Sequence, residues 1–272
     1  MNSGRDILVI DDEPVVLQGV ARICRDEGLS IETAGGGVAG LQRLGQHAYR
    51  LILCDIMMED LDGFGFLAEC RRRGCRSPIV LASGYATGEN AIRSLQCGAF
   101  DYMAKPFTAD ELLAVIRRAL NYSALLAEHL EAWPTIAPRT ANIHHLGRVS
   151  WATSKPEGTV VIGVDGLFVK TIQGLRSVEL APVGAHLVQG MGCATIVSTD
   201  GLAHSVMCPV SGQVLQAHAE AAADFSMIGK DPFGAGWLYR LLPSDLEYSF
   251  RCLTSPSDPP DQRPVHQKGV TS

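Results

Sequence analysis

Carboxylates follow two short apolar runs of the sequence, and this arrangement could bind a metal ion. Residues 51–54 (LILC) precede Asp55, and residues 7–10 (ILVI) precede Asp11 and Asp12. Such runs are typical of strands that are buried on both faces of a parallel sheet. Ligands of open α/β sheets bind beyond the carboxyl ends of the strands, so these carboxylates should meet at one edge. Clustered carboxylates repel one another unless a cation lies among them, and hard oxygen ligands favour Mg2+.

A simpler interpretation of Asp11 and Asp12 stays open. A helix is expected to begin near Pro14, because proline is favoured in the first turn of a helix. The two carboxylates could merely cap that helix.

Two further strand ends carry groups that suit phosphoryl transfer. Residues 77–82 (SPIVLA) precede Ser83, and residues 99–104 (AFDYMA) precede Lys105. A carboxylate nucleophile, a metal ion, a hydroxyl and an ammonium group can together hold and neutralise a transferring phosphoryl group. The sequence therefore predicts a phosphorylation site centred on Asp55.

The motifs DD at 11–12, DIMMEDLDG at 55–63, SGY at 83–85 and AFDYMAKPF at 99–107 follow one another in this order. With them, residues 5 to about 121 resemble the receiver domain of two-component response regulators. The resemblance implies an α/β fold, a doubly wound, flavodoxin-like sheet of five parallel strands. It also implies that a sensor histidine kinase is the phosphoryl donor.

The resemblance assigns a role to each matching residue. Asp55 would be the phosphoacceptor. Mg2+ would be bound directly by Asp12, by Asp55 and by the backbone carbonyl of Met57, while Asp11 would act through water or from behind the direct ligands. Ser83 and Lys105 would bind the phosphoryl oxygens, and Tyr102 would move inward when Ser83 shifts. Glu59 stands where the family usually has proline, so the flexibility of this loop and the dephosphorylation rate could differ from those of the family.

Composition limits the class of protein. The chain of 272 residues is long enough for two domains, and 46% hydrophobic with 19% charged residues is typical of globular proteins. The net charge of -6 argues against nucleic acid as a partner. No apolar run reaches the roughly 18 residues of a membrane helix, and the first residues lack a signal-peptide core. We expect a cytoplasmic protein without membrane partners.

Apolar periodicity predicts the helices between the strands of the first domain. They are expected at about 14–27, 38–46, 64–73 and 87–96, with a further strand at 30–34. The triplet Gly35 to Gly37 lacks the spacing of a phosphate-cradling loop and is expected to be a plain loop before a helix. Alternating strands and helices favour right-handed crossovers on a parallel sheet.

The last helix of this domain has two open interpretations. Thr108 and Glu111 form a capping box, and no glycine or proline follows until Pro134. Apolar or small residues alternate four and three apart in a heptad pattern, which is typical of a parallel dimer stalk. The pattern equally fits a single helix that packs on its own domain and frays after about Tyr122. The heptad residues are Leu112, Ile116, Ala119, Ser123, Leu126 and Leu130. We expect a domain at 1–121 and a helical stalk and linker at 122–143.

From about residue 143 the helical period gives way to short β-rich runs punctuated by glycine. This texture predicts a small all-β barrel or sandwich, with one helix near 220–225. The expected strands are 159–164, 167–172, 177–181, 186–190, 193–198, 213–219 and 236–243.

Four segments of this region resemble the H-protein of the glycine cleavage system. They are GTVVIGVD at 158–165, VELAPVGAHLVQG at 178–190, PVSGQV at 209–214 and DPFGAGWLYRLLPSD at 231–245. The resemblance implies a barrel-sandwich hybrid domain at 144–252. Members of that family carry a lipoyl group on a hairpin lysine, but the corresponding position here is Gly201, and no lysine occurs between Lys170 and Lys230. We therefore expect no lipoate and no lipoyl attachment residue.

The hairpin at 198–204 (STDGLAH) is then a rigid scaffold suited to binding. Its titratable group is His204, for which an exposed position without a function is the more common case. The eight cysteines show no CxxC pair, and most should be buried hydrophobes. Cys193 and Cys208 could in principle attach another group. Residues 253–272 are polar and proline-rich, which predicts a disordered tail.

The sequence as a whole predicts a response regulator that is not an enzyme. Phosphorylation of Asp55 would change dimerisation or domain docking, and so expose or hide the second domain for an unidentified protein target. One alternative is a regulated carrier or accessory protein of glycine cleavage or lipoate metabolism. Another is a DNA-binding regulator, which the absence of a helix-turn-helix pattern or basic stripe after residue 143 disfavours.

Overall fold

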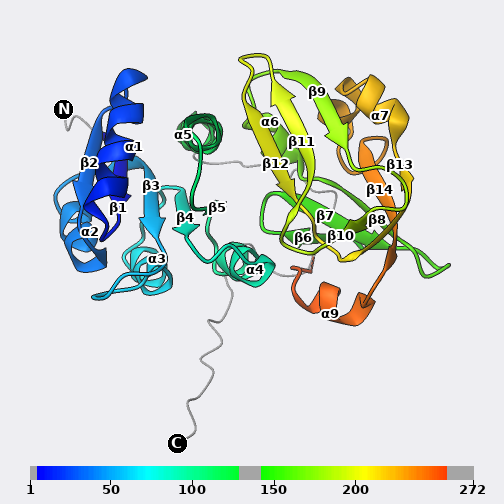
Figure 1. The fold of residues 1–272 in the computed structure, drawn as a ribbon, viewed down its shortest axis with the longest axis horizontal. Helices are drawn as coiled ribbons and strands as arrows, with labels where there is room; N and C mark the ends of the chain where they lie inside the picture. Colours follow the sequence, from blue (N-terminus) through cyan, green and yellow to red (C-terminus); the bar gives the residue numbers. More distant parts are fainter. Residues whose placement is uncertain (1–4, 129–141, 256–272) are drawn as a thin grey trace, which may run out of the picture.

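The computed structural model describes residues 5–128 and 142–255, which form two domains that lie against each other (Figure 1). Residues 5–128 are called the N-terminal domain below, and residues 142–255 the C-terminal domain. No helix in these two ranges is both long and apolar enough to cross a membrane.

The N-terminal domain is built on a five-stranded parallel sheet with the strand order β2-β1-β3-β4-β5. Residues 7–10, 51–54 and 79–82 of its central strands are apolar and buried because helices cover both faces. The prediction of a doubly wound parallel sheet is therefore confirmed. The strands are β1 (Arg5–Ile10), β2 (Ile31–Ala34), β3 (Tyr49–Asp55), β4 (Ile79–Ser83) and β5 (Asp101–Ala104).

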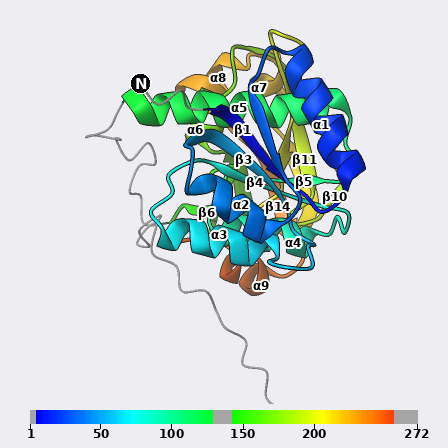
Figure 2. The same ribbon diagram turned by 90° about the vertical axis from the view of Figure 1, so that its left-hand side faces the viewer.

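Five helices alternate with these strands, close to the predicted bounds. Seen from the N-terminal domain in Figure 2, α1 and α5 lie on one face of the sheet, and α2, α3 and α4 on the other. The helices are α1 (Pro14–Asp26), α2 (Gly37–Leu44), α3 (Gly63–Arg72), α4 (Gly88–Gln96) and α5 (Ala109–Glu128).

Helix α5 begins with the predicted capping box. The Thr108 hydroxyl accepts a hydrogen bond from the Glu111 amide at 3.2 Å, and the Glu111 carboxylate accepts one from the Thr108 amide at 2.7 Å. The helix continues to Glu128, so the predicted fraying after Tyr122 is wrong. Heptad residues Leu112 and Leu126 pack into the apolar core of the chain itself, so this seam is engaged within one molecule. Leu130 lies outside the described residues.

The C-terminal domain consists of two antiparallel sheets with short helices at their edges. The larger sheet has the order β10-β13-β14-β8-β7-β6 and the smaller one β12-β11-β9. This arrangement confirms the predicted second, all-β domain. The strands are β6 (His144–Leu146), β7 (Ser150–Ser154), β8 (Val160–Val164), β9 (Leu175–Leu180), β10 (His186–Leu187), β11 (Gly192–Ser198), β12 (Ala203–Met207), β13 (Gly212–Ala217) and β14 (Trp237–Pro243). The helices are α6 (Gly166–Lys170), α7 (Ala219–Ala223), α8 (Ser226–Lys230) and α9 (Leu246–Arg251).

One predicted strand is a helix. Residues 167–172 were expected to be extended, but α6 occupies Gly166–Lys170, and the Asp165 carboxylate caps it by accepting a hydrogen bond from the Leu167 amide at 2.8 Å. A short, fully buried apolar run does not distinguish a strand from a helix, which explains the error. The cap at Asp165 was the overlooked signal.

The predicted disordered tail begins too early. Leu253 is buried, and Thr254 pairs with His145 in an antiparallel bridge with N–O distances of 2.9 and 3.0 Å. The chain is thus bound to β6 as far as this bridge, because backbone pairing outweighs the polar composition. Residues 256–272 lie outside the described residues.

The two domains share an apolar interface. Helices α4 and α5 lie between the parallel sheet and the C-terminal domain (Figure 1). Leu202, after β11, packs with Leu113 and Ala114 of α5, while Leu95 of α4 lies against Gly147. The face of the N-terminal domain formed by α4, β5 and α5 is therefore covered by the C-terminal domain.

Candidate functional site

The carboxyl ends of the parallel strands bring the predicted polar residues to one edge. Asp11 follows β1, Asp55 ends β3, Ser83 ends β4 and Lys105 follows β5. Parallel pairing of β1 with β3, β3 with β4 and β4 with β5 places these ends side by side. The sheet topology thus assembles the site from segments that are distant in the sequence.

Lys105 joins the two buried carboxylates of this edge. Its Nζ lies 2.5 Å from Oδ1 of Asp55 and 2.6 Å from Oδ2 of Asp11. Burial raises the pKa of Asp55, although the hydrogen bond and charge of Lys105 oppose this effect. Burial alone would lower the pKa of Lys105, but its hydrogen bonds to Asp11 and Asp55 leave that pKa raised. The ammonium group therefore stays charged and compensates for negative charge in a poorly solvated position.

Ser83 and Tyr102 meet at the loop that follows β4. Ser83 is fully buried, and its Oγ accepts a hydrogen bond from the Tyr85 amide at 3.1 Å. The Tyr102 hydroxyl donates to the Tyr85 carbonyl at 3.3 Å, with the Tyr102 side chain largely buried. A movement of Ser83 would therefore displace Tyr85 in the loop after β4 and, through the Tyr85 carbonyl, disturb the hydrogen bond of Tyr102.

The remaining predicted metal ligands are more exposed. Met57 is exposed, and its amide donates to Oδ2 of Asp55 at 2.5 Å. Asp12 is also exposed and makes no hydrogen bond or ion pair with any described residue. Asp11 also accepts a hydrogen bond from the Glu13 amide at 3.0 Å, just before α1, so its carboxylate makes this local contact as well as the one with Lys105.

The donor set of this edge fits a hard cation. Asp11 and Asp55 offer carboxylate oxygens, and Met57 lies in an exposed loop beside Asp55. Oxygen donors of this kind suit Mg2+ rather than a softer metal. Within residues 5–128 and 142–255, no three His, Cys, Asp or Glu side chains are already arranged to hold a metal ion, since Asp12 is exposed and Lys105 contacts Asp11 and Asp55. Any cation here would therefore depend on a backbone carbonyl or water as well.

Asp60 was missed by the sequence analysis. Its carboxylate accepts hydrogen bonds from the amides of Gly37 and Val38, both at 3.0 Å, at the first turn of α2. These bonds, led by the one from Val38, lower the pKa of Asp60. A Cβ at Gly37 would lie 2.4 Å from the Leu61 carbonyl oxygen, so glycine permits this approach. Asp60 thus anchors the loop after Asp55, and only the folded arrangement reveals the pairing.

The hairpin between β11 and β12 carries Gly201 at its turn. Gly201 has φ +88°, which residues with a side chain rarely adopt, and its amide donates to the Ser198 carbonyl at 2.9 Å. A Cβ there would meet no atom within 4 Å, so the backbone conformation rather than crowding favours glycine.

His204 is not the exposed residue that was expected. It is only 4% exposed, and its Nε2 lies 3.1 Å from the Ser198 hydroxyl oxygen. Nδ1 is buried without a hydrogen-bond partner in the described part of the chain. Burial and the nearby charge of Arg118 lower the pKa of His204 to about 4. The prediction was wrong because the packing of α5 against β12 could not be foreseen.

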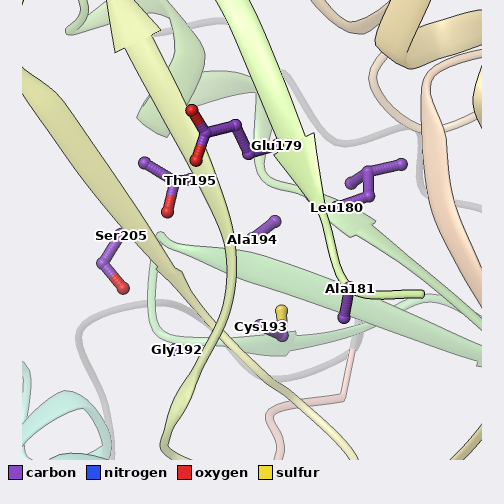
Figure 3. A pocket seen from close by; sticks show the side chains of 8 residues that line it. All are labelled: Glu179, Leu180, Ala181, Gly192, Cys193, Ala194, Thr195 and Ser205. Atoms are coloured by element: carbon purple, nitrogen blue, oxygen red, sulfur yellow. The ribbon is translucent and has the colours of Figure 1, made fainter. Parts of the chain in front are cut away.

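Cys193 lines a surface pocket but is poorly suited to attach a group. The cavity has a volume of about 370 Å³ and includes Glu179, Thr195 and Ser205 of the smaller sheet (Figure 3). The Cys193 thiol is buried, and a hydrogen bond with Cys208, together with burial, holds its pKa well above the ordinary value. A protonated thiol is a weak nucleophile. Apart from Cys193, the pocket contains none of the residues singled out from the sequence.

Comparison with known families assigns each domain. The family model of the response regulator receiver domain matches residues 7–117, and that of the glycine cleavage H-protein matches residues 142–258. Both predicted resemblances are confirmed.

Individual relatives match one domain each. The nitrogen assimilation regulatory protein NtrX of Azorhizobium caulinodans is 36% identical over 137 residues, which is 50% of this chain and 30% of NtrX. The regulatory protein AtoC of Escherichia coli is 35% identical over 122 residues, 45% of this chain and 26% of AtoC. The crystal structure of the glycine cleavage system H protein from Mycobacterium marinum shares 28% identity and covers 40% of this chain and 87% of that protein, with a TM-score of 0.37. The chain thus spans less than a third of these two regulators.

Proposed function

Because the chain joins a response regulator receiver domain to a glycine cleavage H-protein domain, we propose that it is a response regulator of a two-component phosphorelay. Its output is made by protein–protein contacts of the H-protein domain. Receiver domains act with sensor histidine kinases, so the phosphoryl donor is the phosphohistidine of such a kinase.

Asp55 is the proposed phosphoacceptor. Its carboxylate is buried at the sheet edge, and Lys105 contacts it at 2.5 Å, so the ammonium can neutralise charge that develops on a phosphoryl oxygen. Ser83 presents its hydroxyl from the neighbouring strand end. Mg2+, when bound, would shield the negative charge of the phosphoryl group. Asp11, Asp12, Asp55 and the Met57 carbonyl would hold it.

One contact carries the proposed coupling between the domains. The loop after Ser83 contains Tyr85, whose amide donates to the Ser83 hydroxyl, and it ends at Gly88, where its backbone touches Gly190 of the C-terminal domain. A shift of Ser83 toward a phosphoryl group would pull this loop, displace the Tyr85 carbonyl to which the already buried Tyr102 donates, and disturb the contact with Gly190. Phosphorylation then weakens the docking of the H-protein domain on α4, β5 and α5.

The output does not use a lipoyl arm. Such an arm needs a lysine amide, and Gly201 occupies the expected position. We therefore assign the H-protein domain a binding role without catalysis, in which a protein target meets the surface that docking hides.

Intact-mass spectrometry tests this function. The protein is purified from its native host and incubated with acetyl phosphate and Mg2+, beside Asp55→Ala and a control, Asp110→Ala, at an exposed carboxylate of α5. We expect one added phosphoryl group in the wild type and the control but not in Asp55→Ala. An unchanged wild-type mass, or phosphorylation of Asp55→Ala, would contradict the proposal. Small-angle X-ray scattering of the same samples then reports whether the domains separate.

The alternative function is a regulated carrier or accessory protein of glycine cleavage or lipoate metabolism. The match of residues 142–258 to the H-protein family favours it, and Gly201 argues against it. A lipoyl adduct in the starting mass would establish this alternative. A DNA-binding output is tested by a gel shift, in which we expect no retarded band.

A further inference from the structure

We propose that the hairpin formed by β11 and β12 is the surface that recognises the target protein, and that the target presents an amphipathic helix. In that helix an arginine follows apolar residues by one helical turn. In the structure, helix α5 of the same chain packs against the hairpin at the place where the helix of the target would bind. The inference rests on the proposed function, because it concerns the surface that undocking would release.

The apolar half of the contact is centred on Leu202. This side chain is 8% exposed and packs with Leu113 and Ala114 of α5, with Ile23 of α1 at the margin. A leucine at a hairpin tip would be exposed if α5 moved away. Its burial therefore depends on an apolar partner surface.

The polar half of the contact is an ion pair beside Leu202. Oδ2 of Asp200 lies 2.7 Å from Nη1 of Arg117, which also binds Glu27 at 2.8 Å through Nη2. Arg117 follows Leu113 by four residues, so the two side chains lie on the same face of α5, one turn apart. The hairpin thus contacts an apolar residue through Leu202 and an arginine through Asp200, and these two partners lie one helical turn apart.

The hairpin is shaped by its own domain rather than by α5. The Ser198 amide donates to the Leu202 carbonyl at 2.9 Å, and the Gly201 amide donates to the Ser198 carbonyl at 2.9 Å. The Ser198 hydroxyl also donates to Asp200, which orients that carboxylate from behind. A turn that is closed by these bonds should keep its shape after release and so be ready for a second helix.

Helix α5 is held on the hairpin weakly enough for another helix to replace it. The side chains of Arg117 and Asp200 are 39% and 26% exposed, and such partly solvated ion pairs stabilise only weakly. Proteins that recognise an amphipathic helix bind apolar anchor residues of this kind at helical spacing. A target helix with the same pattern could therefore take the place of α5 once the domains separate.

A peptide with the sequence of residues 109–128, labelled with a fluorophore, is the probe for this surface. Its binding is measured by fluorescence anisotropy to the full chain carrying Arg117→Asp, which opposes Asp200 with a like charge and so weakens the contact of α5 with the hairpin without phosphorylation. We expect at least tenfold tighter binding to this variant than to the unphosphorylated wild type. Arg25→Asp, on the exposed side of α1, is the control and should bind like the wild type.

A charge exchange makes the test specific for Asp200. The peptide should lose at least tenfold affinity for the protein that carries both Arg117→Asp and Asp200→Arg, because these changes restore an opposite pair within the chain. A peptide carrying Arg117→Asp should bind the Asp200→Arg protein better than the unmodified peptide does. Equal binding of both peptides to that protein, or no binding to the Arg117→Asp protein, would overturn the proposal.

The same experiment separates this inference from the proposed function. Peptide binding to the Arg117→Asp protein, with none to the wild type after acetyl phosphate and Mg2+, would support recognition by the hairpin and contradict its control by phosphorylation. Binding in both cases would support both.

Discussion

Gly88 and Gly190 meet backbone to backbone across the boundary between the two domains. A Cβ at Gly88 would lie 2.4 Å from the Gln189 carbonyl oxygen, and one at Gly190 would lie 2.3 Å from the Gly88 carbonyl oxygen. Gln189 cannot easily yield, because its side-chain amide donates to two backbone carbonyls, those of Pro209 and Ser249. The contact is therefore possible only with glycine at both positions.

Gly88→Ala should loosen the docking of the domains. The added methyl group would push α4 away from the turn at Gly190, and we expect a loss of about 1–3 kcal/mol in the free energy of unfolding. The radius of gyration from small-angle X-ray scattering should rise. Gly19→Ala is the matched control, because nothing lies within 4 Å of its Cβ position and it is within helix α1. That change should be neutral or stabilise by up to about 1 kcal/mol.

Lys105→Met should destabilise the protein at neutral pH. Asp11 and Asp55 would lose the ammonium between them, and breaking a buried ion pair costs about 3–5 kcal/mol. Urea unfolding measures the change. Adding Mg2+ should recover more stability in this variant than in the wild type, because the carboxylates would lack another cation. Lys155→Met, at an exposed lysine, should change neither quantity. Equal effects of Mg2+ on all three proteins would argue against cation binding here.

Asp60→Ala should lower the free energy of unfolding and detach the loop that carries Met57 and Glu59 from helix α2. Two amides of the first turn of α2 would lose their charged acceptor, which corresponds to about 1–2 kcal/mol for a helix cap. Chemical denaturation gives the free energy, and hydrogen exchange should show faster exchange at Gly37 and Val38. Glu59→Ala is the neighbouring control and should leave both unchanged. A similar loss in both variants would mean that Asp60 is not the anchor.

His204 should make folding sensitive to acid. Its pKa is about 4 in the folded chain and about 6.5 in the unfolded chain, so between these limits the unfolded chain binds more protons. This contribution is complete above about pH 6.5 and is lost as the pH falls toward 4, at a total cost of up to about 3 kcal/mol. Arg118 opposes protonation and Asp200 favours it.

The variant His204→Gln isolates this effect. Glutamine does not titrate, so the free energy of unfolding should fall less steeply between pH 6.5 and pH 4 than in the wild type. His186→Gln, at an exposed histidine, should keep the wild-type slope. Parallel curves for His204→Gln and the wild type would contradict the lowered pKa.

The parallel sheet and its edge could be predicted because their signals are local. Apolar runs that end in Asp55, Ser83 and Lys105 specify both the strands and the polar groups at their ends. Their convergence follows from the general topology of α/β sheets. The capping box at Thr108 likewise needs only residues within one turn.

Apart from the helix at Gly166–Lys170, whose cap at Asp165 is a local signal, the errors concern contacts that no local pattern encodes. His204 is buried by helix α5, which precedes it by about 80 residues. Asp60 caps helix α2, from which it is separated in the sequence by the whole of strand β3. Thr254 is ordered only because His145 offers two backbone partners. In each case a pairing that is distant in the sequence overrides composition.

Arg118 belongs to both domains at once. It is 3% exposed, forms an ion pair with Asp101 of β5, and stacks on the ring of Phe168 in α6 at 4.0 Å. Removal of the C-terminal domain would leave this guanidinium without its aromatic neighbour and uncover the apolar surface around it. The two domains are consequently not interchangeable modules. A chimera that replaces the C-terminal domain must supply an aromatic neighbour for Arg118 in place of Phe168. One that replaces the N-terminal domain must supply a cation for Phe168, whether or not it can be phosphorylated.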